Sequence, residues 1–276
     1  MPKDTHRSWS VVLLLAVTFA NSPAAGDWYD NLSTSVRGGK ASFDFRLRSE
    51  IADLASFAED ARASTLRSRL TWTSAALGPW SYGAEADHVA VIGSDRYNSL
   101  SNGMTRFPVI PDPDGFDLNR LYVAYSSDAF AAKLGRQRMN HDRQRFVGGV
   151  AWRQNEQSLE GVRFEFGDRF KIDYAYATRV NRIFGPDDGV QPKRWDSSSH
   201  FVRGAFAPAK GHKVVAFGYL MDFENGNGIP NSNSTFGVEY SGKVAAQTIQ
   251  RRREGHNQRD VDIGAGEIVA MQLTIH

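Results

Sequence analysis

The sequence predicts an all-β protein, an antiparallel up-and-down transmembrane β-barrel, from three observations. Ten short segments alternate apolar with polar residues, which is the period of a half-buried strand. The gaps between them are alternately long and short, as in outer-membrane barrels, whose hairpins turn tightly on the periplasmic side and loosely outside. After residue 25 no run of even 12 continuous apolar residues occurs, so the mature chain contains no candidate for a transmembrane helix.

Residues 1–25 have the features of an export signal peptide. Lys3 and Arg7 form a basic start, which is followed by the apolar stretch 11–20 (VVLLLAVTFA) and by mostly small residues at 22–26. Ten apolar residues are too few for a membrane anchor, because a helix needs about 20 to cross the hydrocarbon core. We therefore expect the mature chain to start near residue 26 in the cell envelope.

Residues 26–243 contain the ten expected strands. They are 41–51, 64–73, 79–91, 119–127, 130–137, 157–167, 169–183, 199–207, 212–224 and 233–241. The longer gaps are 52–63, 92–118, 138–156, 184–198 and 225–232, and the short ones are 74–78, 128–129, 168 and 208–211. Most segments reach the length of a tilted membrane-crossing strand, which is about 9–11 residues.

The alternation also predicts which side chains face lipid, because successive side chains of a strand point to opposite faces. The clearest segment places on one face Phe170, Ile172, Tyr174, Tyr176 and Val180, and on the other Lys171, Asp173, Ala175, Ala177 and Arg179. We expect the first set to face lipid and the second a water-filled lumen. In 132–138 and 200–206 the pattern does not decide the facing.

The alternating pattern is lost after Lys243. Residues 244–276 form an atypical charged tail in which 267–275 alone alternates again and could add one strand. We therefore expect about 10–11 strands of a larger barrel, left incomplete by a truncation or a frameshift.

One stretch is more specific than the strand pattern. Residues 135–157 read GRQRMNHDRQRFVGGVAWRQNEQ, which resembles the GRQR…RFVG…WRQNEQ signature of alginate-export-type outer-membrane porins. The resemblance extends over residues 40–243. It implies an outer-membrane channel that passes anionic polysaccharide, such as polyuronates, or small organic anions. It also implies contact with membrane lipid and lipopolysaccharide, and an inward-folded loop that narrows the pore.

Arginines are the candidate anion-binding residues, since guanidinium stays protonated and its planar fork matches carboxylates. The predicted pore-lining set is Arg46, Arg48, Arg67, Arg69, Arg136, Arg138, Arg143, Arg145, Arg153, Arg163 and Arg179. The alternative is that these arginines pair with lumen carboxylates and brace the wall. The carboxylates available for that role are Asp44, Glu50, Glu85, Asp87, Asp173 and Glu239.

Other functions find little support in the sequence. Charge is nearly balanced, with 33 Lys+Arg against 31 Asp+Glu, so nothing suggests a nucleic-acid partner. The absence of cysteine excludes disulfides and thiolate metal sites. No catalytic motif is present, and we expect no enzyme activity, cofactor or metal. The acidic loop 112–119 has calcium-like spacing but lacks the bidentate Glu of an EF-hand, which favours a metal-free turn.

Two alternatives remain for the chain as a whole. One is a secreted or periplasmic β-sandwich that binds or cleaves carbohydrate, and the other is a non-functional porin fragment.

Overall fold

The structure is a computed structural model that describes residues 25–187, 189–243 and 267–269. The signal-peptide prediction and most of the predicted tail lie outside the described residues. The elements are α1 (Ala25–Arg37), β1 (Lys40–Ala52), β2 (Ala61–Thr73), β3 (Trp80–Arg96), β4 (Gly115–Ser126), β5 (Phe130–Gln137), β6 (Ser158–Phe166), β7 (Phe170–Asn181), β8 (Arg194–Phe206), β9 (His212–Met221), the 3₁₀-helix η1 (Gly226–Asn231), β10 (Asn233–Lys243) and β11 (Glu267–Val269).

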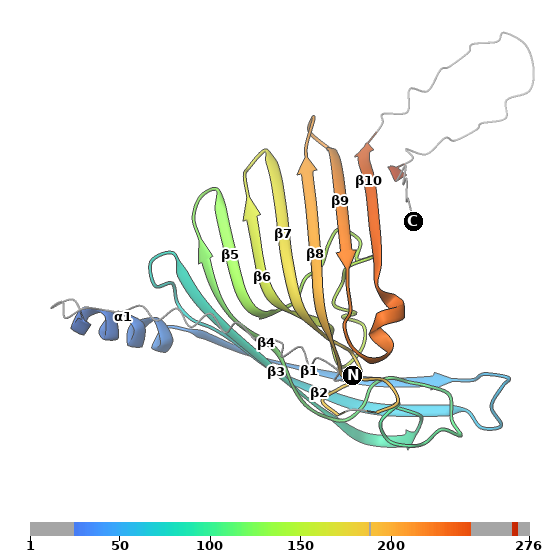
Figure 1. The fold of residues 1–276 in the computed structure, drawn as a ribbon. Helices are drawn as coiled ribbons and strands as arrows, with labels where there is room; N and C mark the ends of the chain where they lie inside the picture. The colour runs from blue at the N-terminus through green and yellow to red at the C-terminus, as the bar shows by residue number, and fades with distance from the viewer. Residues whose placement is uncertain (1–24, 188, 244–266, 270–276) are drawn as a thin grey trace, which may run out of the picture.

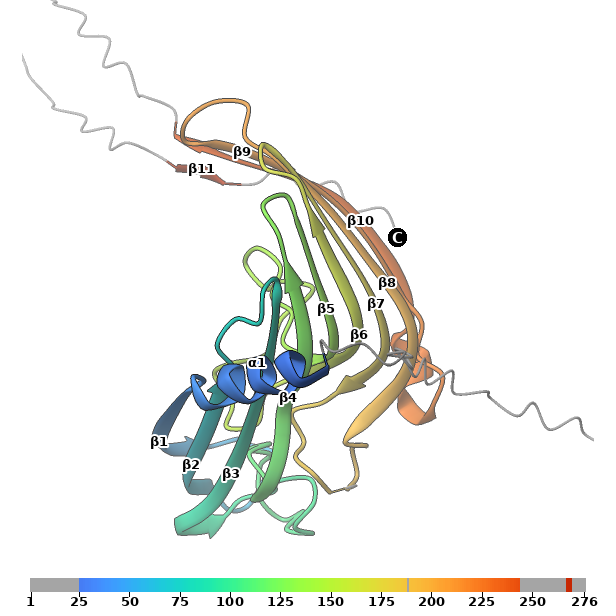
Figure 2. The same cartoon turned by 90° about the vertical axis from the view of Figure 1, so that its left-hand side faces the viewer.

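The strands form one antiparallel sheet in chain order, from β1 to β11. The sheet is strongly curved and open, with β1 at one edge (Figures 1 and 2). This confirms the predicted up-and-down fold, and it differs from the two packed sheets of a β-sandwich. Within the expected tail, only the three residues of β11 are described, and they pair with β10. No described helix is long and apolar enough to span a membrane.

Facing follows the predicted alternation over most of the sheet. On β1, Phe43, Phe45 and Leu47 are 67–70% exposed on the outer face. The two undecided segments are also resolved. Leu134 of β5 and Val202 of β8 are exposed, whereas Phe201 is buried on the inner face.

The alternation breaks once on β7. A bulge at Thr178 puts two residues opposite Glu160 of β6, which shifts the parity of everything that follows. Val180 is therefore buried on the inner face, and the prediction that it faces lipid is wrong. The same bulge turns its neighbour Arg179 outward, beside Glu160.

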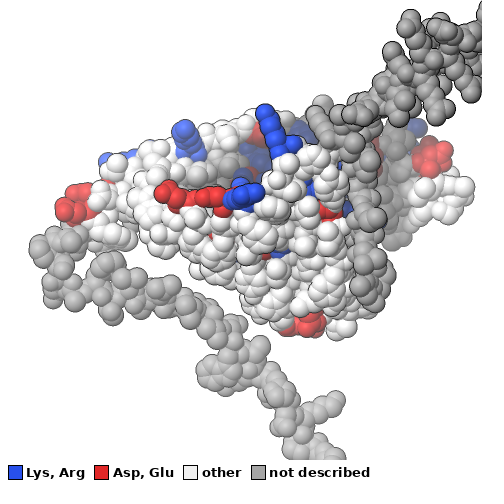
Figure 3. All heavy atoms as spheres, turned by 90° about the horizontal axis from the view of Figure 1, so that it is seen from above, with Lys and Arg blue, Asp and Glu red and all other residues white. Residues whose placement is uncertain are grey.

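Aromatic rings line the outer face near the tight turns. Ring pairs pass from strand to strand: Trp80–Tyr125, Tyr125–Phe130, Phe130–Phe166 and Phe170–Phe206, with centroids 5.0–6.4 Å apart. Such a row is typical of the aromatic girdle at a membrane interface. Seen from above in Figure 3, most of the surface is uncharged, with separate groups of Lys or Arg and of Asp or Glu.

The buried core lies on the inner side of the sheet, beneath the long loops. Met139 and Val147, from the connection between β5 and β6, pack on Leu159, Phe201 and Phe223 of the wall and its neighbouring loop. A second cluster joins the β3–β4 connection to β2, through Tyr97, Phe107, Ile110, Ala61 and Ala63. Two long loops thus fold back onto the sheet.

Candidate functional site

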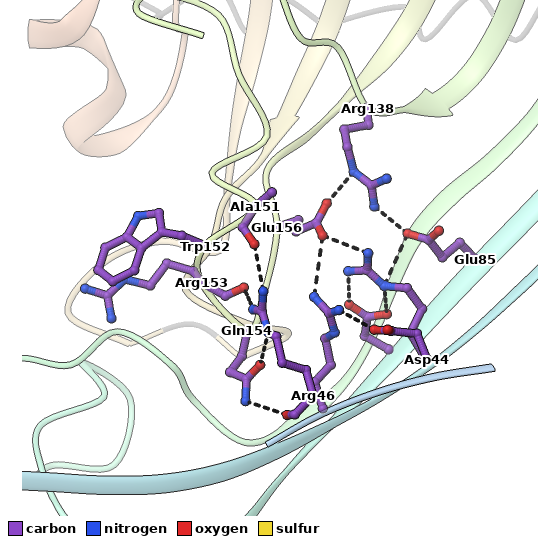
Figure 4. A network of polar contacts seen from close by, with 12 residues as sticks. Asp44, Arg46, Glu85, Arg138, Ala151, Trp152, Arg153, Gln154 and Glu156 are labelled. Carbon is purple, nitrogen blue, oxygen red and sulfur yellow. Dashed lines mark hydrogen bonds and ion pairs between the residues drawn. The ribbon is translucent and has the colours of Figure 1, made fainter. Parts of the chain in front are cut away.

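Residues 138–157, between β5 and β6, leave the wall and fold against the inner face of the sheet. We call this segment the inward loop. One part contacts β1, β2 and β3, and the other part contacts β7, β8 and β9. Figure 4 shows the first of these contacts, where arginines of the wall converge on the loop.

Arg46 of β1 holds the backbone of the inward loop. Its guanidinium donates to the Gln154 Oε1 atom at 2.9 Å, to the Ala151 carbonyl at 2.8 Å and to the Arg153 carbonyl. Gln154 is fully buried and donates in turn to the Thr65 Oγ1 atom on β2 at 2.9 Å. Among the described residues Arg46 has no ion pair, so its charge is solvated by neutral oxygens.

Glu156 is the acidic centre of the contact. Its carboxylate is 5% exposed and lies 2.7 Å from Arg69, 3.5 Å from Arg67 and in direct contact with Arg138. These arginines have further carboxylate partners: Asp87 at 2.6 Å from Arg69, Asp44 at 2.5 Å from Arg67 and Glu85 at 2.5 Å from Arg138. The wall and the loop are therefore joined by one continuous network of ion pairs, several of which are also hydrogen bonds within the wall.

Trp152 lies at the solvent side of this network, 57% exposed. The guanidinium carbons of Arg153 and Arg48 lie 3.9 and 4.5 Å from its ring centroid, which is cation–π geometry. Both arginines also pair with Glu50, and both approach the buried carboxylate of Asp112.

The other part of the inward loop is held by Asp142 and His141. Asp142 pairs with Arg203 at 2.6 Å and Lys213 at 3.0 Å, and the hydrogen bond from Arg203 lowers the pKa of this loop carboxyl to about 2. His141 is buried between the Tyr219 hydroxyl at 2.9 Å and the Asp173 carboxylate at 3.1 Å.

The predicted arginines fall into three groups. Those on the inner face or in the loop network are Arg46, Arg48, Arg67, Arg69, Arg138, Arg153 and Arg163, the last paired with Asp173 at 2.6 Å. Arg143 and Arg145 lie exposed on the inward loop. Arg136 and Arg179 both pair with Glu160, which shares the outer face with Val162 and Phe164 of the same strand.

Several residues of the site were missed from the sequence. Arg120 contacts Glu85 on β3, and Arg203 and Lys213 hold Asp142. Each contact joins residues at least 35 positions apart, so no local spacing indicates it. Gln154 and Glu156 do lie in the WRQNEQ stretch, which was a usable signal.

Cavities lie between the inward loop and the wall. One of about 260 Å³ is lined by apolar and aromatic side chains, among them Met139, Val147, Trp195, Phe201 and Phe223, together with polar ones such as Gln157. A smaller one of about 90 Å³ shares Phe146 and Val147 with it and has Arg143, Arg145 and Glu239 in its lining.

The acidic loop 112–119 takes part in the site without a metal-like geometry. One Asp112 oxygen accepts the Gln154 backbone N–H at 2.9 Å, and the other faces Arg48 and Arg153. Among the described residues, no three His, Asp or Glu side chains are grouped as metal ligands.

A single up-and-down sheet with an apolar outer face, a charged inner face and an inward loop defines an outer-membrane β-barrel protein. Residues 42–257 match the family model described as alginate export. The chain therefore belongs to the alginate-export family, whose members lie in the outer membrane. No curated protein matches it in sequence.

Solved outer-membrane porins share the fold. OccAB1 of Acinetobacter baumannii superposes with a TM-score of 0.57 at 13% identity, over 76% of this chain and 49% of that one. OccK8 (OprE) of Pseudomonas aeruginosa gives 0.54 at 11%, over 75% and 50%. OpdK of the same organism, determined with vanillate, gives 0.52 at 10%, over 77% and 55%. The chain thus spans about half the length of these proteins.

Proposed function

We propose that the chain forms part of an outer-membrane channel for anionic solutes, either polyuronates or small organic acids. The observation that carries the proposal is the inward loop, which places cationic side chains over the inner face of a membrane-spanning sheet. Rings or rows of Arg are how anion pores select their solutes.

Two of the predicted arginines form no ion pair among the described residues, although Asp112 and Glu156 attract Arg46 at longer range. Arg46 is surrounded by neutral oxygens, and Arg143 is exposed and has no hydrogen bond or ion pair in the part of the chain that the structure describes. By contrast, Arg67, Arg69 and Arg138 are largely neutralised by their carboxylate partners and serve to hold the loop. The alternative, in which arginines brace the wall, therefore applies to the arginines that pair with carboxylates. The anion preference rests on the remaining arginines of the predicted set.

The aromatic side chains of the cavity beside the arginines favour small organic acids over polyuronates. Binding sites for small molecules combine apolar and aromatic walls with a few placed polar groups. The cavity supplies Trp195, Phe201 and Phe223, and Arg143 and Arg145 line the neighbouring one. A carboxylate attached to a hydrocarbon or aromatic body matches this pairing, and OpdK, with the same fold, was determined with such a molecule, vanillate.

Reversal potentials in planar bilayers across a salt gradient test the proposal. We expect anion preference that weakens from 0.1 to 1 M salt, because the Debye length falls from about 10 to about 3 Å. Replacing Arg143 and Arg145 together by Gln should reduce the preference. The matched control is Arg96→Gln, which removes an exposed cation that pairs with Glu59 outside the inward loop.

Cation selectivity, or anion selectivity unchanged in the double variant, would refute the role of these arginines. Absence of any conductance from a closed barrel that contains these residues would refute the channel itself.

A further inference from the structure

The helix α1 carries an apolar stripe that the site does not use. Trp28, Tyr29, Leu32 and Val36 recur at helical spacing, so they share one side of the helix. Tyr29 is 67% exposed and Val36 46% exposed. Asp27, Asp30, Thr34 and Arg37 occupy the rest of the surface. A face of this kind in water is costly unless a second apolar phase covers it.

The structure fixes the end of the sheet at which α1 lies. The Ser35 hydroxyl donates to the Ala75 carbonyl, and the Ala75 N–H donates to the Ser35 carbonyl at 2.9 Å. Ala75 belongs to the tight turn between β2 and β3. Tight turns mark the periplasmic end of an outer-membrane barrel, so α1 is at that end. In Figure 1 the helix projects sideways from the start of β1.

The link between α1 and β1 lies against the lipid-facing side of the sheet. A side chain at Gly39 would meet the Trp72 indole at 2.5 Å, so the backbone passes directly over that ring. Trp72 pairs with Ala41 across the strands and shares its face with Leu70, which pairs with the exposed Phe43. The helix therefore starts from the outer, apolar surface, on the same end as the aromatic row.

We propose that α1 lies in the periplasmic headgroup region of the outer membrane, with Tyr29, Leu32 and Val36 toward the acyl chains. Amphipathic helices bind in this way with their apolar face about 5–10 Å deep. The aromatic row on the outer face defines the interface, and the stripe of α1 continues it beyond β1. The acidic and hydroxyl residues of the opposite side then face the periplasm.

The alternative is that the apolar stripe of α1 packs against the protein itself. A helix folded under the sheet would put Tyr29 and Val36 against the lumen mouth. Two contacts argue for the membrane. The turn residue Ala75 holds α1 at the rim, and the outward ring of Trp72 holds the link that follows α1 on the outer face.

Site-directed spin labelling tests the proposal directly, because the chain has no cysteine. Single labels at Val36→Cys on the stripe and at Thr34→Cys on the opposite side form a matched pair within one turn. A third label, at Phe45→Cys, reports whether the outer face of β1 is in lipid. The samples are vesicles of phosphatidylethanolamine and phosphatidylglycerol containing the full chain. The readout is collision with dissolved oxygen relative to a water-soluble nickel chelate.

We expect the collision rate with oxygen, divided by that with the nickel chelate, to be several-fold higher at position 36 than at position 34. The ratio should be higher still at position 45, which lies deeper in the membrane. Equal ratios at 34 and 36, with lipid exposure at 45, would overturn the helix placement alone. A label at 36 shielded from both reagents would overturn it in favour of the lumen mouth. Water exposure at both 36 and 45 would overturn it together with the membrane-embedded sheet. None of these spin-label measurements depends on conductance. Failure of the channel proposal can therefore be distinguished from failure of the proposed placement of α1.

Discussion

Glu156→Gln should release the inward loop from the wall. Glu156 is buried and contacts three arginines, and the amide that replaces it carries no charge to balance them. Removing one partner of a buried ion-pair network costs about 3–5 kcal/mol. Asp44, Asp87 and Glu85 remain as partners of these arginines, so we take the lower end. A loss of about 3 kcal/mol makes the population of molecules with the inward loop released roughly 150-fold larger.

Limited trypsin digestion measures this release, because the loop contains the exposed arginines Arg143 and Arg145. When opening is fast relative to cleavage, the cleavage rate follows the population of the open loop. We therefore expect cleavage at 143 and 145 to accelerate about 100-fold or more in Glu156→Gln.

The matched control is Glu59→Gln, which makes the same chemical change at a carboxylate 42% exposed and paired with Arg96. Exposed pairs contribute only about 0–1 kcal/mol, so cleavage of the inward loop should be nearly unchanged. Equal acceleration in both variants, or none in Glu156→Gln, would show that the network does not hold the loop.

Two further predictions concern the wall and the pH dependence of the loop. Tyr174→Arg, on the outer face, should lower the free energy of unfolding by about 2–4 kcal/mol. Glu165→Arg, on the inner face at a side chain 55% exposed, should cost much less, and equal losses in urea titrations of vesicle-bound protein would contradict the facing. Because the pKa of Asp142 is lowered to about 2, its ion pairs stabilise the docked loop above about pH 4 and are lost as the pH falls through about 2. Hydrogen exchange of the loop amides around residue 142, corrected for intrinsic rates, should show this loss in the parent chain and a smaller loss in Asp142→Asn.

The alternation of apolar and polar residues was sufficient to predict most of the sheet. Where it gave the wrong start for a strand, a β-bulge interrupts the pairing. The segment 130–137 has the bounds of β5, because its pairing is regular. β4 begins at Gly115 rather than 119, since an extra residue opposite Glu85 and Ala86 breaks the alternation. β8 begins at Arg194 rather than 199 because its pairing with β7 is irregular next to Thr178. The helix α1 was not predicted at all, although its stripe is visible in the sequence.

The site was only partly predictable for a related reason. Strand parity identifies Arg46, Arg48, Arg67 and Arg69 as inner-face residues without any structure. It cannot identify their partners, because the contacts to the inward loop join positions more than 85 residues apart. For Arg179 parity alone was misleading, since a single bulged residue exchanges the two faces.

The long reach of the inward loop has a consequence for the order of folding. Every strand from β1 to β10 pairs with its neighbour in sequence, so the sheet can grow by successive hairpins with little loop-closure entropy. Docking of Gln154 onto Arg46, by contrast, closes a span of 108 residues, and entropy disfavours such contacts until the intervening strands are in place. The loop should therefore be the last part of this region to become ordered. Only then would its network fix the angle between β1–β3 and the rest of the sheet.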